Sequence, residues 1–145
     1  PMAYTLELLM FWSDASKSVT VGIAATLGVA LGAFVQAILA REFYCDFLGF
    51  QWEWEHRFGD NFPLYCQVQR GECILHLSGH FGDATPGSHI RIEMNNIQDY
   101  TAGLRGKDHK HCKPGLPEKM DWGTTEITVS DPFGNRLTFY EVPPK

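Results

Sequence analysis

The segment His89–Met94 alternates three side chains that could bind a ligand with three apolar ones. Successive side chains of a β-strand point to opposite faces, so one face of this strand would be apolar and would pack on the core. The other face would carry an imidazole, a guanidinium and a carboxylate, from His89, Arg91 and Glu93. These groups can hydrogen-bond a small molecule, which makes this face a candidate binding surface.

Two further segments show the same alternation. In Cys73–Ser78, burial of the two leucines turns His76 and Ser78 to the outer face. In Arg136–Glu141, the outer face receives Arg136, Thr138 and Tyr140, and Glu141 points away from it. A histidine on such a face is most often simply solvated or hydrogen-bonded, and a role as metal ligand is the alternative.

Aromatic side chains could supply stacking surfaces to a ligand. Trp52 and Trp54 alternate with two glutamates, and they suit the core or a subunit interface as well as ligand stacking. Asp60 and Phe62 follow in the next loop and could add a carboxylate and a further ring.

Cysteine and histidine spacing gives no metal or disulfide motif. The four cysteines form no Cys-x-x-Cys pair, which predicts reduced thiols and a cytoplasmic protein; they are Cys45, Cys66, Cys73 and Cys112. The tract His109–Cys112 has metal-binding residue types, but it lies among Lys, Gly and Pro without a second ligand pair. The sequence therefore predicts a surface loop for this tract.

Composition limits the class of partner. The chain has 145 residues, enough for one ordinary domain, and a formal net charge of −5 with scattered Lys and Arg. Because there is no basic stripe, nucleic acid is not expected as a partner. The acidic balance would weakly suit a cationic ligand.

Periodicity and turn residues predict the elements that position these side chains. A helical spacing of apolar residues followed by Gly49 predicts a helix near 37–48. Alternation bounded by turn residues predicts strands at 51–56, 64–69, 73–78, 89–94, 126–130 and 136–141, with a short helix at 97–104.

Three stretches resemble the vicinal oxygen chelate superfamily, which includes glyoxalase I, fosfomycin-resistance proteins, extradiol dioxygenases and bleomycin-resistance proteins. They are Ala40–Phe50, Gly71–Ser78, and the ending Asp131–Glu141 preceded by Trp122-Gly123. The resemblance implies an α+β fold in which two βαβββ modules form a curved mixed sheet around a cleft. It covers residues 27–145 as one domain, with modules near 27–80 and 86–142, and leaves 1–26 as an extension.

The resemblance implies that the first strand comes from about Thr26–Phe34. The surrounding segment, Val19–Ala40, has only Thr and Gln as polar residues and is long enough to cross a bilayer. Its small residues make it a weak membrane span, and the fold would lack a strand without it. A membrane location is therefore not expected.

Metal enzymes of this superfamily have ligands at four equivalent strand positions. The resemblance carries these positions to Val29, His76, His89 and Thr138, of which only the two histidines can coordinate an ion. It thus implies a binding protein of the bleomycin-resistance type, without a cofactor. The alternative is a lyase, isomerase or dioxygenase that depends on a divalent metal at His76 and His89.

We therefore expect a non-metal binding protein that sequesters an aromatic or cationic small molecule in a cleft between two identical subunits. Stacking would come from Trp52, Trp54, Phe62 and Tyr140, and negative charge from Asp60 and Glu93. The polar residues His76, Ser78, His89, Arg91 and Thr138 would complete the site.

Overall fold

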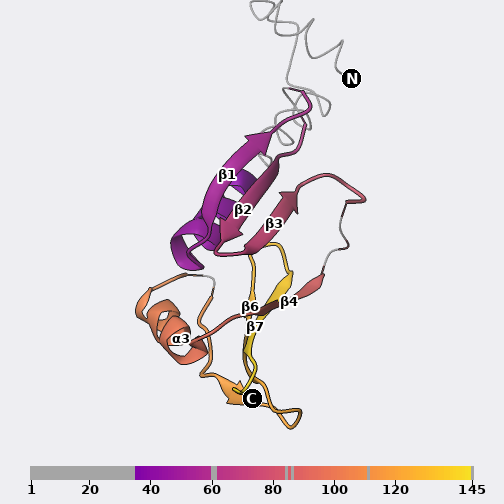
Figure 1. The fold of residues 1–145 in the computed structure, drawn as a ribbon. Helices are drawn as coiled ribbons and strands as arrows, with labels where there is room; N and C mark the ends of the chain where they lie inside the picture. Colours follow the sequence, from indigo (N-terminus) through magenta and orange to yellow (C-terminus); the bar gives the residue numbers. More distant parts are fainter. Residues whose placement is uncertain (1–34, 60–61, 84, 86, 111, 145) are drawn as a thin grey trace, which may run out of the picture.

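The computed structural model describes residues 35–59, 62–83, 85, 87–110 and 112–144, and the chain enters this part through a helix. Val35–Ala40 is α-helical and continues into the π-helical segment η1, Arg41–Phe47 (Figure 1). The helix ends at Phe47 and is followed by Leu48 and by Gly49, whose φ of 80° suits a residue without a side chain. The N–H of Gly49 donates to the carbonyl of Cys45 at 3.1 Å.

Three antiparallel strands follow in the order β1-β2-β3. They are β1 (Gln51–His56), β2 (Tyr65–Arg70) and β3 (Cys73–Ser78). The two-residue connection between β2 and β3 begins with Gly71 at φ 59°, and Arg70 pairs with Cys73. This tight turn determines the register along the whole hairpin.

A β-bulge interrupts β1 at Glu53. Trp52 pairs with Val68, whereas Trp54 pairs with Gln67, so Glu53 has no partner of its own in the register. An extra residue in a strand reverses the side on which the following side chains lie. The two tryptophans therefore lie on opposite faces of the sheet, which corrects the expectation that both contribute to one stacking surface.

The second half of the described chain forms a βαβββ unit. Its elements are β4 (His89–Glu93), α3 (Ile97–Gly106), β5 (Glu118–Lys119), β6 (Thr125–Ser130) and β7 (Arg136–Glu141). The sheet order is β4-β7-β6-β5, with β4 parallel to β7 and the other pairs antiparallel. Glu141 points away from the polar face and accepts hydrogen bonds from the first backbone N–H groups of α3, as expected of an acidic group at a helix N-terminus.

One hydrophobic core joins the two halves. Phe43 and Phe47 of η1 are buried together with Ile97 of α3 and with Leu137 and Phe139 of β7. The half-buried side chains of β3, Leu75 and Leu77, pack against the same cluster. In both halves the helix covers one face of the sheet and leaves the other face to polar residues, and the α+β class expected from the sequence is confirmed.

The sequence-based boundaries agree for β1, β3 and β7 and differ by one or two residues for β2, β4, α3 and β6. Strand β5 was not located, because two exposed charged residues carry no periodic pattern. The expected first strand, Thr26–Phe34, lies outside the described residues, as do Val29 and the division at residue 26. No helix in the described ranges is long and apolar enough to cross a membrane.

Candidate functional site

The uncovered face of the first sheet is a grid of eight side chains. The register aligns Trp54, Gln67 and His76 in its middle row. The flanking rows are His56 with Tyr65, and Gln51 with Gln69 and Ile74. Ser78, the last residue of β3, pairs with Tyr65 but lines a cavity on the helix-facing side. Because strand side chains alternate, Cys66 and Val68 point to the helix instead, where both are buried.

Three rings gather on this grid, and we call Trp54, Tyr65 and His76 the aromatic platform. The Trp54 ring centroid lies 5.8 Å from the centroids of both Tyr65 and His76. The Tyr65 hydroxyl is 3.0 Å from Nδ1 of His76, and the Trp54 Nε1–H donates to Oε1 of Gln67 at 3.1 Å. Trp54 is 41% exposed, so the platform presents ring surface held by ring contacts and hydrogen bonds.

Trp52 belongs to the opposite, helix-facing side. It is half-buried against the hydrophobic core, and the Arg41 guanidinium lies 4.0 Å from its ring centroid. Arg41 also forms an ion pair with Glu55, the next β1 residue on that side, at 2.6 Å. The geometry thus gives Trp52 a packing position and leaves only Trp54 for stacking on the open face.

The open face of the second sheet brings together the polar residues expected from β4 and β7. Nε2 of His89 is 2.7 Å from Oγ1 of Thr138, which is 2.7 Å from Oγ1 of Thr128. The Tyr140 hydroxyl donates to Glu93 at 3.3 Å, and the Arg91 guanidinium lies 4.9 Å from the Tyr140 ring centroid. Thr138 is buried among these neighbours.

Glu126 of β6 is the charged centre of this second face. Arg91 donates two hydrogen bonds to its carboxylate, at 2.6 and 3.0 Å, and Trp122 Nε1–H donates a third at 2.9 Å. The hydrogen bonds from Arg91, with smaller contributions from Thr124 and Trp122, lower the pKa of Glu126 to about 2 against an opposing effect of burial. Arg91 is therefore already paired, and its charge is largely compensated within the sheet.

The two histidines proposed as alternative metal ligands lie on different sheets. His76 contacts Tyr65, and His89 contacts Thr138. In the part of the chain that the structure describes, no three His, Cys, Asp or Glu side chains gather in a metal-binding group. The fourth family position, Thr138, has its hydroxyl engaged with neighbouring side chains.

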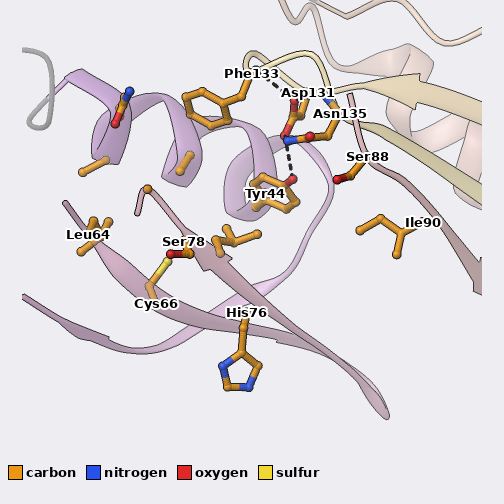
Figure 2. Close-up of a pocket in the computed structure, with 15 residues that line it drawn as sticks. Tyr44, Leu64, Cys66, His76, Ser78, Ser88, Ile90, Asp131, Phe133 and Asn135 are labelled. Atoms are coloured by element: carbon orange, nitrogen blue, oxygen red, sulfur yellow. Dashed lines mark hydrogen bonds between the residues drawn. The ribbon is translucent and has the colours of Figure 1, made fainter. Parts of the chain in front are cut away.

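A cavity of about 280 Å³ lies on the helix-facing side, between the entering helix, β3, β4 and the β6–β7 turn. Figure 2 shows Tyr44, Asp131 and Asn135 along one wall and Cys66 and Ser78 along another. Of the expected site residues, only His76 and Ser78 line it, and the His76 ring points away.

The polar groups of this cavity are largely bonded to one another. The Tyr44 hydroxyl donates to Asp131 at 2.9 Å, and Ser78 donates to Asp83. Burial raises the pKa of the Cys66 thiol to about 12, so the thiol stays protonated at neutral pH and is a poor nucleophile. The wall of the cavity is therefore mostly apolar, and few of its polar groups are left to bind a specific ligand.

Two expected site residues and one predicted loop remain to be placed. Phe62 is 52% exposed in the loop after β1, with its ring centroid 6.3 Å from that of His80, and Asp60 lies outside the described residues. The prediction of a surface loop at His109–Cys112 is wrong for its two ends. His109 stacks on Phe47 at 4.6 Å and is buried, as is Cys112, because both ends of the tract pack on the hydrophobic core.

Tyr65 and Gln67 were missed by the sequence analysis. The signal was present in the short β2–β3 connection, because a two-residue turn places Gln67 opposite His76 and Tyr65 opposite Ser78. Once the outer face of β3 is known, this pairing therefore also identifies Tyr65 and Gln67 as the β2 residues on the same face.

The two sheets, each packed on one face against a helix, define an α+β domain, and comparison with known proteins identifies the family. A family model described as glyoxalase superfamily protein matches residues 14–143. The chain belongs to this superfamily, as the resemblance indicated. The match begins ahead of residue 27, the first residue of the domain that the resemblance implies. None of the curated protein sequences matches the chain.

Solved structures agree on the fold. The antibiotic-binding protein TnmS3 from Streptomyces sp. CB03234 is 21% identical with a TM-score of 0.60, over 74% of this chain and 87% of that one. The bleomycin resistance determinant encoded on transposon Tn5 is 18% identical with a TM-score of 0.56, over 76% and 90%. A bleomycin-binding protein complexed with bleomycin is 18% identical with a TM-score of 0.53, over 69% and 85%.

Proposed function

We propose that this protein binds and sequesters a planar aromatic small molecule on the aromatic platform, without changing it chemically. The observation that carries the proposal is the cluster of Trp54, Tyr65 and His76 on a sheet face that no described residue covers. Aromatic rings held in place in this way give a ligand contact area at low cost in side-chain entropy.

The reactive groups of the described chain favour binding over catalysis. Burial raises the pKa of each cysteine thiol. Glu126 is held ionised by Arg91, and the His89 imidazole is hydrogen-bonded to a threonine. Neither a free general base beside a nucleophile nor a set of metal ligands is formed by these groups. The structural neighbours named for bleomycin and antibiotic binding support the same kind of activity.

We further propose that the protein acts as a cytoplasmic homodimer and needs no cofactor. One chain leaves the platform open, and a second subunit placed over it would enclose a ligand and shield Trp54 and Phe62 from water. Light scattering at micromolar concentration checks the dimer, and a monomer would contradict it.

Binding can be tested with Trp54→Ala and a matched tryptophan control. Trp122 is 67% exposed in the turn between β5 and β6, away from the platform, so Trp122→Ala also removes an exposed indole ring. In calorimetric titrations with bleomycin and a panel of planar aromatic compounds, Trp54→Ala should weaken binding by several-fold, about 1 kcal/mol or more for one stacked ring. Trp122→Ala should bind as the wild type does.

Two results would reject the proposed function. One is the absence of saturable binding that depends on Trp54 with every compound of the panel. The other is mass-spectrometric evidence that a bound compound is converted to a product. Loss of bleomycin binding alone would reject only that ligand.

A further inference from the structure

The hydrogen-bonding polarity of the platform points to a narrower class of ligand. We infer that the platform selects planar aromatic molecules whose ring edge carries carbonyl or carboxylate oxygens, and that it discriminates against cations. The inference rests on the proposed function, because it concerns the same surface. It is carried by Gln67, which lies in register between Trp54 and His76.

The orientation of the Gln67 amide follows from the chemistry of its neighbour. An indole N–H can only donate, so the group of Gln67 that meets Trp54 Nε1 at 3.1 Å must be the carbonyl oxygen. The amide cannot be flipped without placing two donors against each other. Its NH₂ group is consequently left for another partner, and no described residue accepts a hydrogen bond from it.

The neighbouring histidine can add a second donor. Nδ1 of His76 is 3.0 Å from the Tyr65 hydroxyl. When that hydroxyl donates to Nδ1, the neutral imidazole carries its proton on Nε2. The platform then offers N–H donors from Gln67 and His76 beside its rings, and a ligand has to supply acceptor atoms.

Charge on this face argues against a cationic ligand. None of the eight side chains of the grid is a carboxylate. Asp83 accepts a hydrogen bond from Ser78, which lines the helix-facing cavity, and Glu93 belongs to the second sheet, where it accepts from Tyr140. A bound cation would therefore gain only the attraction of the ring faces, with no counter-charge beside them to offset its lost water.

A pair of probes with one ring system tests the inference. Naphthalene-2-carboxylate brings acceptor oxygens, and naphthalen-2-ylmethylammonium brings donors and positive charge. Equilibrium dialysis against the full chain measures each probe by its own fluorescence. We expect the carboxylate to bind at least about tenfold more tightly, a difference of about 1.4 kcal/mol. Neutral 2-acetylnaphthalene should bind several-fold more tightly than naphthalene, because its oxygen accepts from the platform without any charge.

The decisive variant is Gln67→Glu, which removes the NH₂ donor of Gln67 and adds a negative charge. In Gln67→Glu the carboxylate can still accept from Trp54 but has no donor to offer, so the preference should shift towards the ammonium probe. Gln98→Glu places the same charge on the exposed surface of α3, away from the platform, and should keep the preference for the carboxylate. Urea unfolding of both variants tests that they are folded.

The outcomes separate this inference from the proposed function. Trp54-dependent binding that favours the ammonium probe in the wild type, or that keeps its preference in Gln67→Glu, would overturn the inference and leave the platform as a binding site. Probe binding that is unaffected by Trp54→Ala would reject the proposed function, and this inference with it.

Discussion

The hydrogen bond between Tyr44 and Asp131 connects the helix of the first half to the β6–β7 turn of the second, and Tyr44→Phe removes it alone. The Tyr44 hydroxyl is buried and donates to Oδ2 of Asp131 at 2.9 Å. Burial and the Asp131 carboxylate both raise the pKa of Tyr44, so the hydroxyl stays a donor at any working pH. The ring would keep its edge contact with Phe43, whose centroid is 5.3 Å away.

The magnitude follows from the partners that Asp131 retains. Its oxygens still accept from the backbone N–H groups of Phe133 and Asn135 and from the Asn135 side chain. The carboxylate is therefore not left unsatisfied, and the loss should be at the lower end of the range for hydrogen bonds to charged groups, about 1.5 kcal/mol. With a urea m-value of about 2 kcal/mol/M, the unfolding midpoint should fall by about 0.8 M.

The matched control is Tyr140→Phe, which removes an exposed hydroxyl that donates to Glu93 at 3.3 Å. Its free energy of unfolding should change by less than about 0.5 kcal/mol. Equilibrium urea unfolding followed by circular dichroism measures both variants. If Tyr44→Phe were no less stable than Tyr140→Phe, the reasoning that this bond stabilises the contact between the two halves would be refuted.

Three further predictions concern the stability of the tryptophan variants, the loss of folding stability at low pH, and metal binding. Trp52→Ala should lower the free energy of unfolding by about 2 kcal/mol, because its ring packs on the core. Trp54→Ala should have a nearly unchanged free energy of unfolding. Equal urea midpoints for these two variants would contradict this prediction. The pKa of Glu126 is lowered from 4.5 to about 2 in the folded state, so its contribution to stability is present above pH 4.5 and is lost as pH falls towards 2. Replacing Glu126 with Gln should flatten this part of the pH profile of unfolding, and an unchanged slope would show that the pair with Arg91 is not responsible. Protein purified and then offered Ni, Zn, Mn or Fe(II) should hold no stoichiometric ion by mass spectrometry, whereas one equivalent lost on His76→Ala would favour the metal-dependent enzyme.

The periodic elements could be predicted because their patterns are local. The strand Cys73–Ser78 and the strand Arg136–Glu141 were located to the residue, since alternation and turn residues bound both of them. The orientation of His89, Thr138 and Glu141 also followed from alternation. Strand β5 has only two exposed charged residues, and its position depends on pairing with β6.

The face on which Trp54 lies could not be read from alternation. The β-bulge at Glu53 arises from how β1 pairs with β2, and a single extra residue sends Trp52 to the core and Trp54 to the open face. The Lys, Gly and Pro around His109 indicate a surface loop, yet its ring packs on Phe47. Both assignments depend on contacts between segments distant in sequence.

The pattern of the chain indicates the polar face of most strands, because turn chemistry and apolar periodicity act over a few residues. Three of its motifs indicate the fold class and the family by resemblance. Which of the polar residues meet one another depends on the tertiary structure. Strand pairing brought Tyr65 and Gln67 beside Trp54 and His76, and it paired Arg91 with Glu126 across the second sheet. These contacts, between side chains far apart along the chain, set the polarity of the platform and the charge of the second face.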